Sequence, residues 1–189
     1  MEKRGLSEEL KNAGTEADQG AWWADEMRLG LIGQVRRRWV PRGFRLVQEL
    51  QFEYEWEYLN LTVNPLSGEL LWDWSTNMKA VSIATVVSAW HDRGVKVIVW
   101  DGARGHRGAA YEGVPVVRIF QPAYSPELNP AERIFEFLRD KVEGEVYESL
   151  SAKRTAIEDV LQKLVADPQV VKRIAGWRWI LDSIDALAA

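Results

Sequence analysis

The 189-residue chain contains no cysteine and only two histidines, His91 and His106. The lack of cysteine excludes disulfides, thiolate zinc sites and cysteine nucleophiles, and it is consistent with a reducing cytoplasm. Two imidazoles are too few for a histidine-rich metal site. No apolar run reaches the ~18 residues of a membrane helix, and the polar residues 1–19 lack the apolar core of a secretory signal. We therefore expect a cytoplasmic protein with no membrane partner.

Charge is distributed unevenly along the chain, although the net value is only −4. Taken alone, the acidic balance argues against a nucleic-acid partner. Residues 27–48 nevertheless hold six arginines and no acid, whereas residues 49–73 hold six acids and no base. These runs indicate either two solvated faces or a basic strip beside an acidic wall, and composition does not choose between them.

Three strands are predicted in the first half of the chain, over residues 21–33, 52–63 and 69–75. The clearest pattern is FEYEWEYLNLTV, in which Phe52, Tyr54, Trp56 and Tyr58 alternate with glutamates. A period of two predicts one buried and one solvated face, as in an antiparallel strand. Loops of hairpin type separate the second and third strands, so we expect an antiparallel meander preceded by a loose polar tail or linker at residues 1–19.

The second half of the chain predicts helices alternating with buried strands. A helix with an apolar face at Val81, Ala84, Val87 and Trp90 ends at Gly94. β-Branched runs at 95–100 and 114–120 predict strands buried on both faces. Helices follow from 130 to about 144 and from 151 onward. This order predicts an α/β fold, a ribonuclease-H-like mixed five-stranded sheet flanked by helices, over residues 20–150, with a C-terminal helical extension at 151–189.

Three carboxylates fall where this topology brings chain segments together. Asp25 lies in the first strand, Asp101 follows the fourth strand, and Glu132 lies in the first turn of the helix after the last strand. Ligands gather at such strand ends. Acids this close repel each other by about 1 kcal/mol in water and by more when partly buried. A stable cluster therefore implies a raised pKa or bound metal, and hard oxygen ligands suit Mg²⁺ or Mn²⁺.

Each acid also has a purely structural explanation. Asp25 could be an ordinary surface residue, and Asp101 could be the first residue of an Asp-Gly turn. For Glu132 the local pattern favours a helix cap, because Asn129 as N-cap and Pro130 at the first helical position make it part of a capping-box variant.

Several basic residues could contact DNA phosphates. His106, five positions after Asp101, either orients a substrate or a metal-bound water or is a surface loop histidine. The candidate DNA-binding residues are Arg36, Arg37, Arg38, Arg42, Arg104, His106 and Arg107.

Three segments together resemble the catalytic domain of bacterial insertion-sequence transposases of the group called IS-six-thirty, which are relatives of the mariner elements. The segments are ADEMRLGL with RRRWVPRG, VIVWDGARGHRG, and QPAYSPELNPAERIFEFLRDKV, and the tail DPQVVKRIAGWRWIL is also similar. The resemblance runs from about residue 20 to the end of the chain. It implies an Asp-Asp-Glu site of Asp25, Asp101 and Glu132 holding two Mg²⁺ ions, for which Mn²⁺ can substitute. The 31 positions between Asp101 and Glu132 are slightly fewer than mariner relatives usually have.

The resemblance also implies a function. Such enzymes are metal-dependent DNA endonucleases that cut at transposon ends and join the freed 3′-hydroxyl to target DNA, here at the nucleoid of a bacterial cytoplasm. Fewer than about 20 residues precede the first strand, too few for the usual helix-turn-helix modules. The chain is then a second reading frame, a fragment or a degenerate copy, and we expect the helix-turn-helix module to be separately encoded or fused and consider a homodimer. A catalytically silent remnant that only binds DNA or a partner, and a structure-selective nuclease on the same fold, stay open as alternatives.

Overall fold

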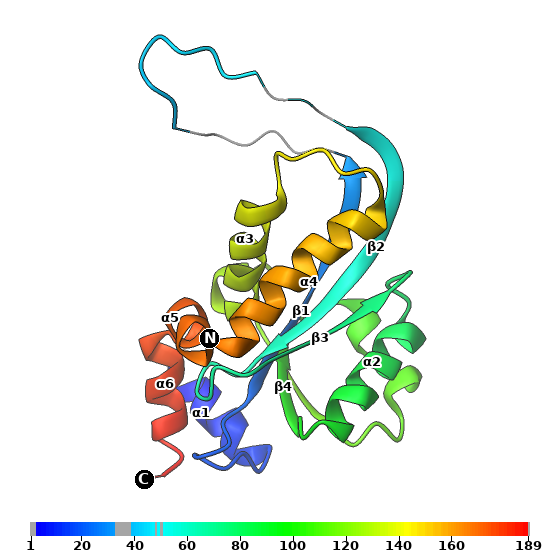
Figure 1. The fold of residues 1–189 in the computed structure, drawn as a ribbon. Coiled ribbons are helices and arrows are strands. Elements are labelled where there is room, and N and C mark those ends of the chain that lie inside the picture. Colours follow the sequence, from blue (N-terminus) through cyan, green and yellow to red (C-terminus); the bar gives the residue numbers. More distant parts are fainter. Residues whose placement is uncertain (1–2, 33–38, 48, 50, 189) are drawn as a thin grey trace.

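The computed structural model describes residues 3–32, 39–47, 49 and 51–188. Figure 1 shows one sheet with helices on both of its faces. In chain order the elements are α1 (Lys3–Asn12), β1 (Trp22–Ile32), β2 (Phe52–Val63), β3 (Leu70–Ser75), α2 (Ala80–Asp92), β4 (Val97–Trp100), η1 (Arg104–His106), η2 (Ala109–Tyr111), β5 (Val117–Phe120), η3 (Pro126–Leu128), α3 (Pro130–Val142), α4 (Leu150–Ala166), α5 (Pro168–Ala175) and α6 (Arg178–Asp185).

The sheet has the strand order β3-β2-β1-β4-β5. The first three strands form the antiparallel meander, and β4 and β5 run parallel to β1. The predicted mixed five-stranded sheet is therefore confirmed. β1 is the central strand, with the antiparallel half of the sheet on one side and the parallel half on the other.

Alternating residues of β1 pack on opposite faces of the sheet. Trp23 and Met27 belong to the core formed with α1 and with helices α3 to α6, whereas Trp22 and Ala24 belong to the core formed with α2. Figure 1 shows α2 apart from α3 and α4, across the sheet. Consecutive residues of this strand therefore face two different helical layers.

The expected loose tail at residues 1–19 is wrong, because it contains helix α1. Leu6 and Leu10 are fully buried in the larger core, and the Ser7 hydroxyl donates to the carbonyl of Ser183 in α6 at 3.1 Å. Two leucines four positions apart form one apolar stripe. In an otherwise polar segment, this stripe is too short to predict a helix from the sequence alone. The helix is stabilised by packing against α6, which lies far away in the sequence.

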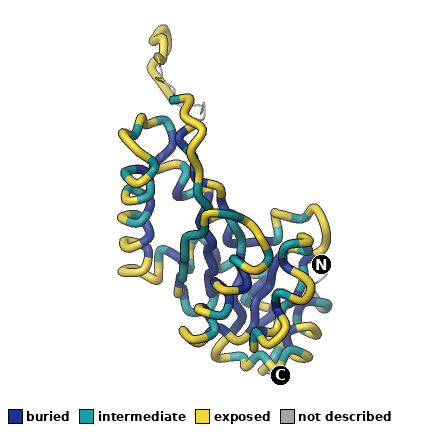
Figure 2. Tube along the Cα trace, turned by 90° about the vertical axis from the view of Figure 1, so that its right-hand side faces the viewer, coloured by how far each residue is buried: buried dark blue, intermediate teal, exposed yellow. Residues whose placement is uncertain are grey.

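The predicted buried face of β2 is wrong for the first half of that strand. Phe52, Tyr54 and Trp56 are 70%, 79% and 46% exposed, and the fully buried part of β2 begins at Leu59. β3 pairs only with the second half of β2, from Tyr58 onward. The first half extends past β3, and Figure 2 shows it leading into the exposed far end of the molecule.

Helix α2 follows its prediction except at one position. Ala84, Val87 and Trp90 are buried, but Val81 is 70% exposed because it lies in the first turn. Gly94 follows the helix with a φ of +99°, which suits a helix end. Among the described helices, none has the length and apolarity needed to cross a membrane.

Candidate active site

The sheet register places Asp25 beside Asp101. β1 and β4 are parallel, and Trp23 pairs with Val99. Two residues further along each strand direction (23 + 2 and 99 + 2) are Asp25 and Asp101. Asp101 directly follows the last residue of β4. This carboxyl end of the parallel strands is where α/β proteins bind their ligands.

Asn129 fixes the start of α3 against β1. Its Oδ1 accepts the Ala131 N–H at 3.1 Å, and its Nδ2 donates to the Ala24 carbonyl at 2.9 Å. The backbone N–H of Asn129 donates to the Pro126 carbonyl at 2.9 Å. The capping-box explanation of Glu132 needs that same N–H, so it is not the arrangement found. Asn129 alone caps the helix.

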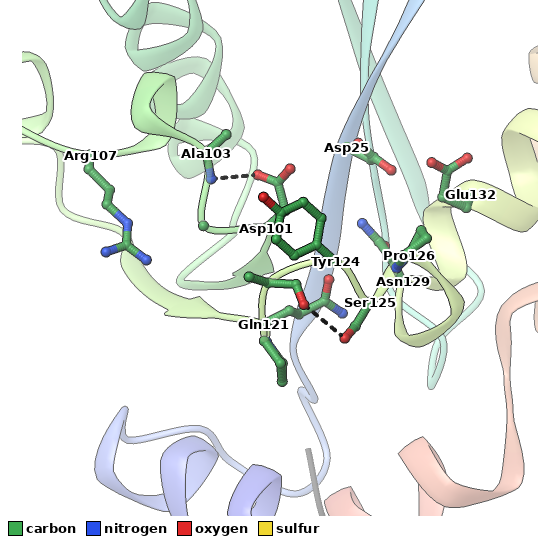
Figure 3. Close-up of a pocket in the computed structure, with 13 residues that line it drawn as sticks. Asp25, Asp101, Ala103, Arg107, Gln121, Tyr124, Ser125, Pro126, Asn129 and Glu132 are labelled. Atoms are coloured by element: carbon green, nitrogen blue, oxygen red, sulfur yellow. Dashed lines mark hydrogen bonds between the residues drawn. The ribbon is translucent and has the colours of Figure 1, made fainter.

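The Glu132 carboxylate is therefore not engaged in a capping box, and it lines the cleft together with both aspartates. Its side chain is 38% exposed, and one oxygen lies 3.8 Å from Nη1 of Arg139, which is about two turns further along the same face of α3. Glu132, Asp25 and Asp101 line a single cleft of about 460 Å³, shown in Figure 3. Side chains from β1, from the end of β4 and from α3 are thus brought to one cavity.

The pKa of Asp25 is affected by the other acids of the cleft and by Glu26. Burial raises the pKa of Asp25 well above its usual range, and the charges of Glu26, Glu132 and Asp101 raise it further. The Glu26 N–H donates to Oδ1 of Asp25 at 2.8 Å and offsets part of this effect. A carboxyl group in this position resists ionisation unless a cation compensates the surrounding negative charge.

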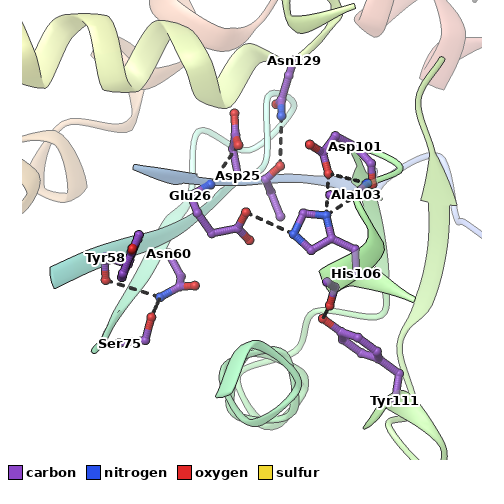
Figure 4. Close-up of polar contacts among 12 residues, drawn as sticks. Asp25, Glu26, Tyr58, Asn60, Ser75, Asp101, Ala103, His106, Tyr111 and Asn129 are labelled. Carbon is purple, nitrogen blue, oxygen red and sulfur yellow. Dashed lines mark hydrogen bonds and ion pairs between the residues drawn. The ribbon is translucent and has the colours of Figure 1, made fainter. Parts of the chain in front are cut away.

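A buried histidine supports Asp101 from the other side of the sheet. His106 is 2% exposed, and its ring stacks on Trp100 with centroids 3.8 Å apart. Nδ1 lies 2.5 Å from Oδ1 of Asp101, and Nε2 lies 3.1 Å from Oε2 of Glu26. Figure 4 shows the imidazole between the two acids. The side chain of Glu26 is itself only 5% exposed, so this contact is shielded from water.

Mutual hydrogen bonding shifts the pKa values of this group. Burial lowers the pKa of His106, but hydrogen bonds to Asp101 and Glu26 outweigh it and raise the pKa to about 9. The hydrogen bond from His106 lowers the pKa of Asp101. Near neutral pH an imidazolium therefore donates to both acids, and Asp101 is held as an oriented carboxylate.

His106 is buried, so the expectation of a surface loop histidine is wrong, whereas its contribution to substrate or DNA binding stays a prediction. Glu26 was missed from sequence, although a signal existed. Adjacent acids in a strand point to opposite faces, so an Asp-Glu pair in a central strand places one carboxylate in each helical layer.

The arginines are dispersed relative to the cleft. Arg107 lines it, and its guanidinium stacks over the Phe120 ring at 4.4 Å. Arg104 is exposed in η1, and Arg42 is exposed in the connection between β1 and β2. The predicted DNA contacts at residues 36–38 lie outside the described residues. Of the described arginine candidates, Arg107 is the one that lines the cleft.

The donor set of the cleft fits a divalent cation. Asp25, Asp101 and Glu132 offer only oxygen, which is the ligand type that Mg²⁺ and Mn²⁺ prefer. The pKa of Asp25 is raised by burial and by the neighbouring acids, and a bound cation would lower it by compensating the negative charge. Within the described part of the chain, no three acidic or histidine side chains are already gathered at coordinating distance. The fit therefore rests on donor chemistry and on the shared cleft.

Known structures share this architecture. The chain is similar to the Mos1 mariner paired-end complex with Mn (TM-score 0.68, 14% identity, 98% of this chain and 59% of that chain). It is also similar to the Mos1 strand transfer complex (0.67, 14%, 98% and 59%) and to the isolated catalytic domain of Mos1 mariner transposase (0.60, 12%, 98% and 88%). The chain thus spans about three fifths of the Mos1 chains in those complexes. At these identities the likeness establishes the fold.

The family assignment comes from the sequence itself. No curated protein sequence matches the chain. The family model described as DDE superfamily endonuclease matches residues 21–152, which is more than half of the chain and includes β1, β4, the start of α3 and all three acids. This chain belongs to the DDE superfamily of endonucleases.

Proposed function

We propose that the chain is the catalytic domain of a transposase, which cleaves DNA strands at transposon ends and joins the freed 3′-hydroxyl to target DNA. The observation that carries the proposal is the meeting of Asp25, Asp101 and Glu132, from three separate elements, in one cleft. Family membership and the fold shared with Mos1 transposase complexes support it.

The three acids would hold Mg²⁺ or Mn²⁺, two ions in all. When bound, such a pair supplies Lewis-acid activation of a water or 3′-hydroxyl and stabilises the leaving oxygen of a phosphodiester. The residues of the chain contribute positioning. His106 would orient the Asp101 carboxylate, and Asn129 would fix Glu132 relative to β1. Arg107, which lines the cleft, would contact a phosphate of the bound strand.

The wider biology is part of the same proposal. We assign catalysis to residues 20–150 and treat residues 151–189 as a helical extension, which the core shared by α3, α4, α5 and α6 supports. The sequence resemblance also supports membership of the bacterial IS-six-thirty group, action at the nucleoid, a helix-turn-helix reader that is either fused or separately encoded, and assembly as a homodimer.

The decisive experiment compares Asp101→Asn with wild type in strand transfer. Uncut duplex DNA is used for cleavage, and an oligonucleotide with a free 3′-hydroxyl together with a plasmid target is used for joining. Both reactions contain Mg²⁺ or Mn²⁺, and the cut and joined products are counted. Asp101→Asn should abolish joining and cleavage while leaving the near-ultraviolet circular dichroism unchanged. Asp92→Asn is the matched control, because Asp92 is an exposed acid at the end of α2.

Two outcomes would contradict the proposal. If Asp101→Asn cut and joined DNA like wild type, Asp101 would have no catalytic role. If wild type were inactive and calorimetry found no carboxylate-dependent Mn²⁺ binding, the chain would be a silent remnant of a transposase.

A further inference from the structure

Tyr124 combines two unfavourable features at the mouth of the cleft. Its side chain is fully exposed, at 101% of the reference area. Its φ of +58° is left-handed, and among the described residues it is the one non-glycine with positive φ. A left-handed backbone is costly for a residue with a Cβ. Because the ring is fully exposed, its packing contributes no stability that would offset the strained backbone. We therefore expect a role of Tyr124 outside the fold.

The loop around Tyr124 is anchored at both ends. The Gln121 N–H donates to the Trp100 carbonyl at 2.7 Å, and Gln121 Nε2 donates to the Leu128 carbonyl at 2.8 Å. Pro122 and Pro126 restrict the backbone on either side of Tyr124. These restraints present the ring at a defined place and do not leave it at the tip of a free loop.

The ring stands where a nucleic-acid strand entering the cleft would meet it. Tyr124 lines the same cavity as Asp25, Asp101 and Glu132, and Figure 3 shows its ring at the front of that group. Arg107 lines this cavity too and offers a cation for a phosphate. A phosphodiester held at the acids would place the attached nucleoside within reach of the rim.

We propose that Tyr124 is a stacking platform for the nucleobase next to the scissile phosphate. A side chain reaches the face of a base only when that base has left the duplex stack. The preferred substrate would therefore be DNA with an unstacked base at that position. Base–aromatic stacking tolerates any sequence because every base has a π-face. This inference rests on the proposed function and adds the local DNA conformation that the site selects.

The test is a double-mutant cycle between the ring and the base. Wild type, Tyr124→Phe and Tyr124→Leu are titrated, at low salt and with Ca²⁺ in place of Mg²⁺, against nicked duplexes. One duplex has a base at every position, and each of the others has an abasic site at a single position beside the nick. Tyr124→Leu should weaken binding about tenfold on intact DNA and leave binding unchanged on DNA that is abasic at one particular position. Tyr124→Phe should match wild type on every duplex, because it keeps the ring.

A further variant separates the backbone from the ring. Tyr124→Gly removes the ring at a φ that glycine adopts freely. It should lose affinity as Tyr124→Leu does, without lowering the urea midpoint of unfolding. A lowered midpoint would mean that Tyr124 serves the fold, which would overturn the proposal.

The remaining outcomes are also decisive. Equal loss on intact and on every abasic duplex would refute base stacking, and so would wild-type affinity of Tyr124→Leu. Strand transfer by wild type is measured in parallel. Active wild type without ring–base coupling refutes the Tyr124 proposal alone, whereas a wild type that neither binds nor joins DNA refutes both proposals.

Discussion

Raising the pH above neutrality should destabilise the protein through His106. The pKa of this residue is 6.5 in its ordinary state and about 9 in the folded protein, where Asp101 and Glu26 accept its hydrogen bonds. The folded state therefore binds the proton more tightly than the unfolded state. The stability that this proton contributes is complete below about pH 6.5 and is lost as the pH rises through about 9.

The size of the effect follows from the pKa difference. The folded and ordinary values differ by about 2.5 (9 − 6.5), and each pKa unit corresponds to 1.36 kcal/mol, which gives about 3 kcal/mol. The His106 side chain is only 3% exposed, so solvent screens little of its interaction with the two acids. A whole domain is stable by roughly 5–15 kcal/mol, and a loss of this size is readily measured.

The assay is urea unfolding followed by tryptophan fluorescence between pH 6 and pH 10, with a chelator present so that no cation competes for Asp101. Wild type is compared with His106→Gln and with His91→Gln, the half-exposed histidine of α2. Between pH 6 and pH 10, the free energy of unfolding of wild type should fall by about 3 kcal/mol more than that of His106→Gln. His91→Gln should show the same pH dependence as wild type. Tyr111, whose pKa burial raises to about 12 in the folded protein, is present in all three proteins, so its titration cancels in the comparison. Parallel curves for wild type and His106→Gln would refute the argument.

Two further predictions concern stability and use the same urea assay. Leu10→Ala should cost about 2–5 kcal/mol, because Leu10 is fully buried in the core; exposed Lys11→Ala is the control, and equal losses would mean that α1 does not pack. Gly68→Ala should cost more than Gly94→Ala. Both glycines have positive φ, but a Cβ on Gly68 would lie 2.3 Å from the Pro168 carbonyl oxygen and one on Gly94 meets nothing within 4 Å. A larger loss for Gly94→Ala would contradict the close contact with α5.

The sheet could be predicted because its signals are local. The period of two in β2 and the β-branched run of β4 depend only on neighbouring residues, and both strands lie where they were expected. Burial is not local in this way. Phe52 and Leu6 are both apolar, yet Phe52 lies beyond the helical layers and Leu6 lies beneath α6. Which of them is covered depends on helices more than a hundred residues away.

The same distinction applies to the site. The segment around Glu132 is compatible with a capping box and with a catalytic acid, and it does not choose between them. The arrangement is set by Asn129, whose side chain bonds Ala24 at 105 positions' separation. His106 is likewise buried between Trp100 and Glu26, and Glu26 lies 80 positions earlier in the chain. The three acids were candidates from sequence, but their common cleft is a product of the tertiary fold.

The adjacent acids of β1 make the cleft sensitive to strand register. Asp25 faces the cleft and Glu26 faces His106, from opposite sides of one strand. A shift of one residue turns every side chain to the other face. A single deletion between Gly20 and Asp25 would therefore place Glu26 at the cleft position and Met27 opposite the imidazole, and it would move Asp25 to the position of Ala24 in the core beneath α2. Insertions or deletions of one residue should therefore disrupt the cleft when they fall between Gly20 and Asp25, although loops elsewhere in the protein can accept them.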